Sequence, residues 1–291
     1  MMMEIILNEY SLDGQFETMD LFFDSLKPMI KIHKLIKEAD TVALLRHHEM
    51  YQRLVTHDKT LHDVMVDNRS RTSDEIRVFK RMIRELTSED PFWTTLPSHK
   101  PSDSYVIATN GSIPTNGHGL AEACERDKVI VSFKHPAFED DTLEILKNNK
   151  PIVIMNFIDP SQLSELMHER RLVTPHLYCK YRFNSEKLCF DLLEEDHGFD
   201  LLTEGEVRAF ISSFKSFHEL SWDEILKSDG LEYKLYSPSR KEEDWFRGSQ
   251  YTNKNISKFR TSRKYRCFGF REGDAFFVLR FELDHKESDK G

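Results

Sequence analysis

Three short apolar runs in the middle of the chain limit its possible folds more than any other feature. They are Ser104–Thr109 (SYVIAT), Val129–Phe133 (VIVSF) and Pro151–Phe157 (PIVIMNF). Each is rich in β-branched side chains, as expected of a buried strand. A Gly-, Asn- and Pro-rich loop with a short helix separates the first two runs, and FEDDTLEILKNN, which we expect to be helical, separates the last two. This alternation predicts a small parallel or mixed sheet with helical crossovers.

The residues before this sheet are expected to be mainly helical. Apolar side chains follow a helical period from Phe16 to Ala43, with Pro28 as a break or kink. A second helix is expected after Ser73, which suits an N-cap, with Glu75 in the first turn. Pro91 should end it. The N-terminal third is therefore predicted to add helices to the central sheet.

The chain of 291 residues is long enough for two domains. We place a helical plus α/β domain at residues 1–175 and an α+β domain at residues 176–291. In the second domain, Tyr178–Leu193 resembles a hairpin that turns at Asn184-Ser185, and Thr203–Leu220 resembles an amphipathic helix that begins with a capping box. The predicted class is mixed α/β, and the second domain has an antiparallel sheet with flanking helices.

Composition narrows the class of protein. The formal charge of -9 argues against a protein that coats DNA non-specifically, because phosphate affinity requires clustered lysine and arginine. The N-terminus MMMEIILNEY lacks the basic segment of a secretory signal, and no apolar run is long enough to span a bilayer. Four scattered cysteines without a C-x-x-C pair fit a reducing compartment. We expect a cytoplasmic protein without membrane association, cofactor or metal ion.

One segment of this acidic chain is strongly basic. Between Lys254 and Arg271 there are seven lysines and arginines and no aspartate or glutamate. This segment leads into one of the most apolar runs of the chain, Ala275–His285 (AFFVLRFELDH). Clustered basic charge beside a predicted strand favours a local anion-binding surface, with RNA phosphate as the expected ligand. The alternative is a solvated face, or a strand that docks on an acidic partner.

The two C-terminal strands are expected to form a hairpin. A three-residue loop, Glu272-Gly273-Asp274, joins Lys264–Arg271 to Ala275–His285 and keeps apolar residues on one face. This register places Arg266 opposite Arg280. Like charges directly across a strand pair are unfavourable, and a bound phosphate between two guanidinium groups would remove the repulsion.

The surroundings of this arginine pair suggest RNA chemistry. Phe268 would share the face with Phe270 and Phe276, where bases could stack. Further cations precede or flank the hairpin, and we assign them to nucleic-acid binding: Lys258, Arg260, Arg263, Lys264 and Arg271. His285 ends the second strand, and histidine can transfer protons when a ribose 2′-hydroxyl attacks the adjacent phosphate. An exposed or structural histidine is the simpler alternative.

The segments KFRTSRKYRCFGF and AFFVLRFELDHKESD, preceded by a helix pair, resemble the RelE/YafQ/HigB group of ribonuclease toxins. In that family a small sheet with two flanking helices cuts messenger RNA with basic and histidine or tyrosine side chains. The resemblance implies that Arg266 and Arg280 hold phosphate and that His285 acts as acid or base. Because such toxins are small, this longer chain suggests a bacterial antiviral defence or abortive-infection protein, with RNA and a protein partner or inhibitor as binding partners.

A second candidate site lies in the loop Asn110–Gly119 (NGSIPTNGHG), between a predicted strand and a helix. Helix N-termini after glycine loops bind phosphate well, although this loop matches no standard nucleotide-binding motif. Glu122 and Glu125 could share a helix face as metal ligands, and a solvated face is the alternative. A nucleotide- or metal-dependent enzyme is therefore a further alternative for the whole protein. His47 and His48 are adjacent in a predicted helix and do not form a chelating pair.

Overall fold

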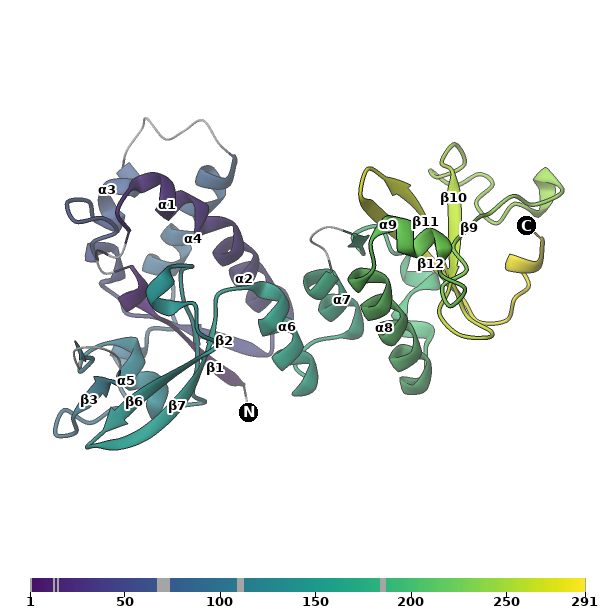
Figure 1. Cartoon of the computed structure of the whole chain (residues 1–291). Coiled ribbons are helices and arrows are strands. Elements are labelled where there is room, and N and C mark those ends of the chain that lie inside the picture. Colours follow the sequence, from purple (N-terminus) through teal and green to yellow (C-terminus); the bar gives the residue numbers. More distant parts are fainter. Residues whose placement is uncertain are drawn as a thin grey trace. The chain divides into compact units, whose positions relative to one another are not determined.

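Two units make up the chain, residues Met1–Leu172 and Val173–Gly291 (Figure 1). The computed structural model describes residues 2–12, 14, 16–66, 74–108, 113–183 and 187–290. Each unit combines helices with a β-sheet, so the predicted mixed α/β class is confirmed. A search of these residues finds no helix that is both long and apolar enough to cross a bilayer.

The N-terminal unit is built on a seven-stranded sheet with the order β2-β1-β5-β7-β6-β3-β4. The pairs β2-β1, β1-β5 and β5-β7 are parallel, and the remaining pairs are antiparallel. The predicted mixed sheet is therefore present, with four further strands that the sequence did not indicate: β1, β2, β4 and β6. The strands are β1 (Met3–Leu7), β2 (Val42–Leu45), β3 (Tyr105–Ile107), β4 (Ile113–Pro114), β5 (Val129–Val131), β6 (Thr142–Lys147) and β7 (Lys150–Phe157).

The predicted helix over Phe16–Ala43 is two helices followed by a strand. The helices α1 (Met19–Asp24) and α2 (Leu26–Ala39) meet at Ser25, and Pro28 lies in the first turn of α2, where proline is tolerated. Asp40 ends α2 in the left-handed conformation, with φ of 54°. The chain then enters β2, which pairs in parallel with β1.

The helix expected over FEDDTLEILKNN is wrong. Residues of β6 alternate between buried and exposed, and β6 forms a hairpin with β7. Asn148 and Asn149 make the two-residue turn, with φ of 49° and 63°. Positive φ at both central residues is typical of tight hairpin turns, and asparagine adopts it more readily than most residues. The turn signal and the period of two therefore outweighed the helical interpretation of the acidic segment.

The remaining helices of this unit are α3 (Leu61–Val66), α4 (Asp74–Ser88), α5 (Gly119–Cys124) and α6 (Pro160–Glu169). The predicted helix after residue 73 is confirmed as α4, which buries Phe79, Met82, Ile83 and Leu86 on one face. Its expected N-cap, Ser73, lies outside the described residues. In Figure 1, α1, α2 and α4 gather above the strands of the sheet, and α2 packs against α4 and β2.

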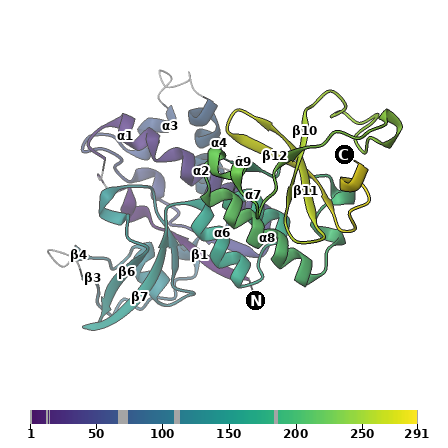
Figure 2. The ribbon, with the colours of Figure 1, turned by 45° about the vertical axis from the view of Figure 1, so that its right-hand side comes forward.

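The C-terminal unit has a five-stranded sheet with the order β8-β12-β11-β10-β9. Figure 2 shows its strands β10, β11 and β12. The pair β8-β12 is parallel, and the other pairs are antiparallel. The strands are β8 (Leu188–Cys189), β9 (Lys234–Leu235), β10 (Ile256–Arg260), β11 (Arg266–Glu272) and β12 (Ala275–Glu282); the helices are α7 (Pro175–Phe183), α8 (Glu204–Glu219) and α9 (Trp222–Lys227).

Two local predictions in this unit have opposite outcomes. The capping box of α8 is confirmed, since Thr203 Oγ1 accepts from the Glu206 backbone N–H and the Glu206 carboxylate accepts from the Thr203 backbone N–H. The hairpin expected over Tyr178–Leu193 is wrong, because its first half belongs to α7 and only β8 is a strand. Its expected turn, Asn184-Ser185, lies outside the described residues.

Apolar side chains cover both faces of the five-stranded sheet. On one face, Phe259 and Phe276 pack against Phe214 and Phe217 of α8. On the other face, a separate cluster joins strand residues to the segment that follows β9; its members are Tyr236, Phe246, Tyr251, Ile256, Phe268, Phe270 and Leu279. The sheet therefore has no broad face of exposed aromatic side chains.

Candidate functional site

The register of β11 and β12 differs from the one expected. The strands turn at Gly273-Asp274, and a bulge between Phe268 and Gly269 shifts the pairing, so that Arg266 faces Glu282 and Phe268 faces Arg280. A Cβ atom on Gly269 would overlap the backbone oxygen of Phe277 and would lie 2.7 Å from the ring of Phe276. The close backbone approach at the bulge therefore requires glycine. The predicted opposition of two arginines is wrong.

Both arginines already have anionic partners in the protein. Arg280 donates from Nε and Nη2 to the two carboxylate oxygens of Glu194, at 2.8 and 3.1 Å. Arg266 donates to the backbone oxygens of Ser262 and Tyr265 at 3.0 Å, and its Nη2 lies 3.9 Å from the Glu232 carboxylate. Each arginine is less than one-tenth exposed. Neither guanidinium group is therefore arranged to receive a ligand.

Three other predicted RNA-binding cations also contact protein groups. Lys258 Nζ donates to the backbone oxygen of Ser288 at 2.5 Å. Arg260 forms an ion pair with Glu232 at 2.6 Å. Arg271 lies 3.8 Å from the centre of the Trp222 ring and 3.6 Å from the Asp274 carboxylate, and it is more exposed than the other two.

The predicted stacking platform does not form. Phe268 and Phe276 are fully buried, and Phe270 is almost so. Phe276 packs with the helices, whereas Phe268 and Phe270 belong to the cluster on the opposite side of the sheet. No base can stack on these rings without unfolding the core.

Several cations nevertheless share one face of this sheet, which we call the basic face. It consists of Lys234, Lys258, Arg260, Arg266 and Arg280, because directly paired residues and alternate residues of a strand point to the same side. Three carboxylates lie among them: Glu194, Glu232 and Glu282. Burial lowers the pKa of Lys258 and of Arg266, each of which also has a neighbouring cation. The sequence did not reveal these acidic partners, since Glu194 and Glu232 lie far from the hairpin along the chain.

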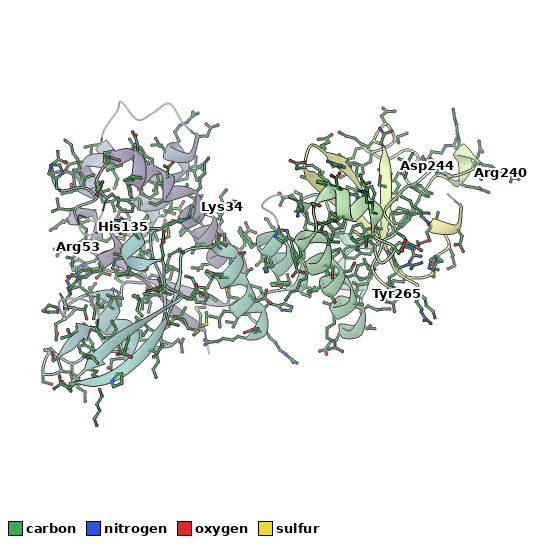
Figure 3. The ribbon with its side chains drawn as sticks, in the orientation of Figure 1. Lys34, Arg53, His135, Arg240, Asp244 and Tyr265 are labelled. Atoms are coloured by element: carbon green, nitrogen blue, oxygen red, sulfur yellow. The ribbon has the colours of Figure 1, made fainter. Side chains whose placement is uncertain are left out.

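Two predicted cations remain at the rim of this face. Arg263 and Lys264, in the turn between β10 and β11, are exposed, and within the described residues neither side chain forms an ion pair. Tyr265 follows them and is labelled in Figure 3. Its hydroxyl donates to the Glu206 carboxylate at 3.3 Å. We call Arg263 and Lys264 the rim cations.

His285 lies beside the rim cations. Its Nε2 donates to the backbone oxygen of Arg263 at 2.8 Å, which leaves Nδ1 to accept from the Ser288 hydroxyl at 2.9 Å. The side chain is 27% exposed. His285 therefore links the end of β12 to the turn before β11, and both of its ring nitrogens are engaged.

A second group of polar side chains lies at the carboxyl ends of the parallel strands of the N-terminal unit. Glu9 follows β1, and the strand order reverses here, because β2 lies on one side of β1 and β5 on the other. Ligands of open α/β sheets usually bind at such a reversal. Glu9 is buried, and its carboxylate accepts from the backbone N–H of Gly119, the first residue of α5, at 2.8 Å.

The imidazole of His118 lies close to Glu9. His118 Nδ1 lies 3.8 Å from the Glu9 carboxylate, and the His118 ring lies 4.6 Å from the ring of Tyr10. Burial lowers the pKa of His118 to about 4, with further lowering by Arg53 (labelled in Figure 3) and His47. These five residues come from three segments that are far apart in the sequence, so their proximity could not be predicted from it. We call Glu9, Tyr10, His47, Arg53 and His118 the strand-end cluster.

The carboxylates considered as metal ligands have other partners. Glu122 accepts from the backbone N–H of Ser98 and from Arg126, and Glu125 accepts from the hydroxyl of Tyr105. Within the part of the chain that the structure describes, no group of three histidine, cysteine or acidic side chains is arranged to hold a metal ion. Part of the candidate loop Asn110–Gly119 lies outside the described residues.

The predicted helix around His47 and His48 is also wrong. Both residues lie in the irregular segment after β2, where their rings stack with centres 5.1 Å apart. The His47 ring accepts from the Glu49 backbone N–H within that segment, and His48 contacts Thr94 outside it.

No family model matches the chain, and no curated protein or solved structure matches it.

Proposed function

We propose that the C-terminal unit binds RNA through the rim cations, Arg263 and Lys264. The observation that supports this is their exposure without an ion pair in the described part of the chain, beside a face that contains five further cations. Lysine and arginine contact phosphate oxygens, and binding releases counterions. The helix pair α8-α9 also precedes the strands β9, β10, β11 and β12, which is compatible with the helix pair and hairpin on which the toxin resemblance rests.

This proposal places phosphate recognition at the rim and not between Arg266 and Arg280. Because the aromatic rings are buried, the RNA backbone is the recognised element, and little sequence preference is expected. Metal-independent cleavage is the activity implied by the resemblance. His285 would transfer the proton, after releasing its hydrogen bonds to Arg263 and Ser288. A bacterial defence protein held by an inhibitor is the setting that we propose for it.

Charge reversal at the rim tests the RNA proposal. We expect Arg263→Glu/Lys264→Glu to weaken binding of fluorescein-labelled single-stranded RNA at least about tenfold in anisotropy titrations, and to lower the salt slope by about two, one per lost phosphate contact. The control is Lys227→Glu/Lys241→Glu, which makes the same charge change on α9 and in the segment after β9. Equal losses in both variants would mean that only net charge matters.

Cleavage is measured on the same RNA in EDTA. We expect His285→Ala to abolish strand scission, and His285→Gln to abolish it while preserving one hydrogen bond to the turn. Binding without scission in the unsubstituted protein would reduce the proposal to a non-catalytic interaction. Failure to bind RNA at low salt would remove the proposal entirely.

A second function is favoured by the strand-end cluster. We propose that the N-terminal unit binds a small anionic ligand, such as a nucleotide, beside Glu9 and His118. The specific support is the position of these residues at the strand-order reversal, close to the positive charge of Arg53. A neutral imidazole can donate or accept a hydrogen bond there, and the carboxylate can accept from ligand hydroxyl groups.

Thermal unfolding in the presence of ATP, NAD and inorganic phosphate tests this second proposal. A ligand at about 100 times its dissociation constant stabilises the folded state by about 2.7 kcal/mol, which is easily measured as a shift of Tm. We expect at least one of these probes to shift Tm, and His118→Asn to remove the shift. The control is His57→Asn, at an exposed position. Unchanged Tm with all three probes would contradict the proposal.

A further inference from the structure

The last described residues, 284–290, fold back across the basic face. Figures 1 and 2 show this segment in yellow beside the five-stranded sheet. The Ser288 backbone oxygen accepts from Lys258 Nζ, and the Glu282 carboxylate accepts from the backbone N–H groups of Glu287 and Ser288 at 2.6 and 2.9 Å. His285 adds the hydrogen bond to Arg263. We call residues 284–290 the C-terminal segment.

The C-terminal segment brings negative charge to buried cations. Asp289 acts electrostatically on both Lys258 and Arg266, and opposes the lowering of their pKa by burial. Both cations are less than one-tenth exposed. Buried charges are unfavourable unless they are paired and hydrogen-bonded, so a negative or strongly polar group is required at this place.

The attachment of this segment is polar throughout. Its sequence, DHKESDK, contains no aliphatic or aromatic hydrocarbon side chain, so the segment buries little apolar surface. One oxygen of Glu282, a residue that is 4% exposed, has no hydrogen-bond partner in the described part of the chain. Segments with few apolar contacts open at small free-energy cost, because their local stability is well below that of the core.

We infer that the C-terminal segment occupies a phosphate-binding subsite at Lys258, and that RNA displaces it. This inference rests on the proposed RNA binding at the rim cations. The Ser288 backbone oxygen that accepts from Lys258 stands in for a phosphate oxygen. Once the segment leaves, the subsite and the rim cations form one continuous basic strip along β10 and the turn that follows it.

In this arrangement, the C-terminal segment lowers the affinity of the protein for RNA. With the C-terminal segment in place, Lys258 is covered, and affinity is weak and strongly dependent on salt. With the segment displaced, Lys258 also contacts the ligand, while Arg260 and Arg266 keep their contacts with Glu232. RNA and the segment therefore compete for the same positive charge, and any condition that loosens the segment raises RNA affinity.

A variant of the full chain that loosens the segment tests this inference. Ser288→Pro removes the N–H that donates to Glu282, and Asp289→Lys places a like charge beside Lys258 and Arg266. We expect Ser288→Pro/Asp289→Lys to bind fluorescein-labelled single-stranded RNA about tenfold more tightly or better. The control is Asp284→Lys, which adds the same charge in the same segment but removes only the contact with Lys286.

A second substitution locates the gained contacts. In the loosened variant, Lys258→Met is expected to remove most of the gain in affinity, because the lysine then contacts RNA. In the otherwise unsubstituted chain it is expected to change affinity less than about twofold, because the lysine is covered. Equal effects of Lys258→Met in both backgrounds would overturn the inference.

The outcomes of these binding measurements distinguish failure of the proposed RNA binding from failure of the proposed displacement of the C-terminal segment. If neither the unsubstituted protein nor the loosened variant binds RNA, the proposed function itself fails. If both bind RNA with the affinity of the Asp284→Lys control, the protein binds RNA but RNA does not displace the C-terminal segment. Amide hydrogen exchange gives an independent reading: RNA is expected to speed exchange at Glu287 and Ser288, and unchanged protection with RNA bound would rule out displacement.

Discussion

Arg280→Ala is expected to destabilise the C-terminal unit by about 3 kcal/mol, the usual loss when one partner of a buried ion pair is removed. The guanidinium group is nearly buried and binds Glu194 through two hydrogen bonds. It also lies 4.4 Å from the ring centre of Phe246 and donates to the backbone oxygen of Trp245. Its loss leaves the Glu194 carboxylate without its counter-ion and detaches two segments from β12.

Denaturant unfolding followed by tryptophan fluorescence measures this loss. The chain has three tryptophans, and Trp93→Phe leaves only Trp222 and Trp245, both in the C-terminal unit. The control is Arg271→Ala on the same hairpin. Because Arg271 is exposed and its ion pair is at the surface, its expected loss is below about 1 kcal/mol.

A double-substitution cycle identifies the partner. Arg280→Ala/Glu194→Ala should lose clearly less stability than the sum of the two single substitutions, since the second substitution removes a carboxylate that is already unpaired. The sequence-based interpretation makes the opposite prediction: if Arg280 waited for a phosphate, Arg280→Ala would leave stability unchanged and abolish RNA binding. One unfolding curve and one RNA titration of Arg280→Ala therefore distinguish a structural role of Arg280 from phosphate binding.

Local sequence patterns predicted the two strands of this hairpin, but not their register or the partners of their charged residues. Alternating apolar residues and Gly273 correctly indicated two strands joined by a tight connection. The bulge at Gly269 was not predictable from alternation, because it depends on a close approach between two backbones. The turn is one residue shorter than expected and the bulge adds one more residue of shift, so that Glu282 and not Arg280 lies opposite Arg266, and an attraction replaces the predicted repulsion.

The partners of the basic residues could not be predicted for a different reason. Glu194 and Glu232 reach the basic face from outside the hairpin, and no periodicity connects them with Arg280 or Arg260. A charge count along a short segment therefore overstated the free positive charge. The same limit applies to the strand-end cluster, where Glu9 and His118 meet because α5 packs against β1.

Elements with a single strong signal were predicted well. The capping box at Thr203 and the apolar face of α4 both depend on neighbours within one helix. The strand β6 was missed because its acidic and aliphatic residues fit a helix and a strand about equally, and only the turn at Asn148-Asn149 distinguishes them. Local sequence therefore accounts for most elements, and tertiary contacts account for the sites.

The N-terminal unit is expected to lose stability as the pH falls from about 6.5 to about 4. Burial lowers the pKa of His33, His47 and His118 from 6.5 to about 4 in each case. Neighbouring cations lower these pKa values further: Lys37 and Arg46 act on His33, and Arg53 acts on His47 and His118. Carboxylates oppose the shift at two of the histidines, Glu85 at His33 and Glu49 at His47.

The sign follows from proton binding. Between pH 6.5 and 4, these three histidines bind protons in the unfolded chain and not in the folded unit, so protons favour unfolding. The stabilisation is complete above pH 6.5, decreases as the pH falls, and stops changing below about 4, when the folded form is protonated too. The full pKa shift of one histidine would contribute about 3 kcal/mol to the free energy of unfolding. Because the three rings are partly exposed, we expect about 1 kcal/mol from each of them.

Trp93 reports on this unit alone when Trp222 and Trp245 are replaced by phenylalanine. We expect the free energy of unfolding to fall by about 3 kcal/mol between pH 7 and pH 4, and His47→Gln/His118→Gln to make the slope clearly shallower. The control is His57→Gln at an exposed position. Because the slopes are compared, a uniform loss of stability in the variant does not affect the result.

Glu122 contributes to the pH dependence of stability only below about pH 4.5. Burial raises its pKa, but its hydrogen bonds with His99, Ser98 and Arg126 lower the pKa by more. A flat profile between pH 7 and pH 5 would show that these imidazoles reach water in the folded unit, and would remove the neutral His118 from the strand-end cluster.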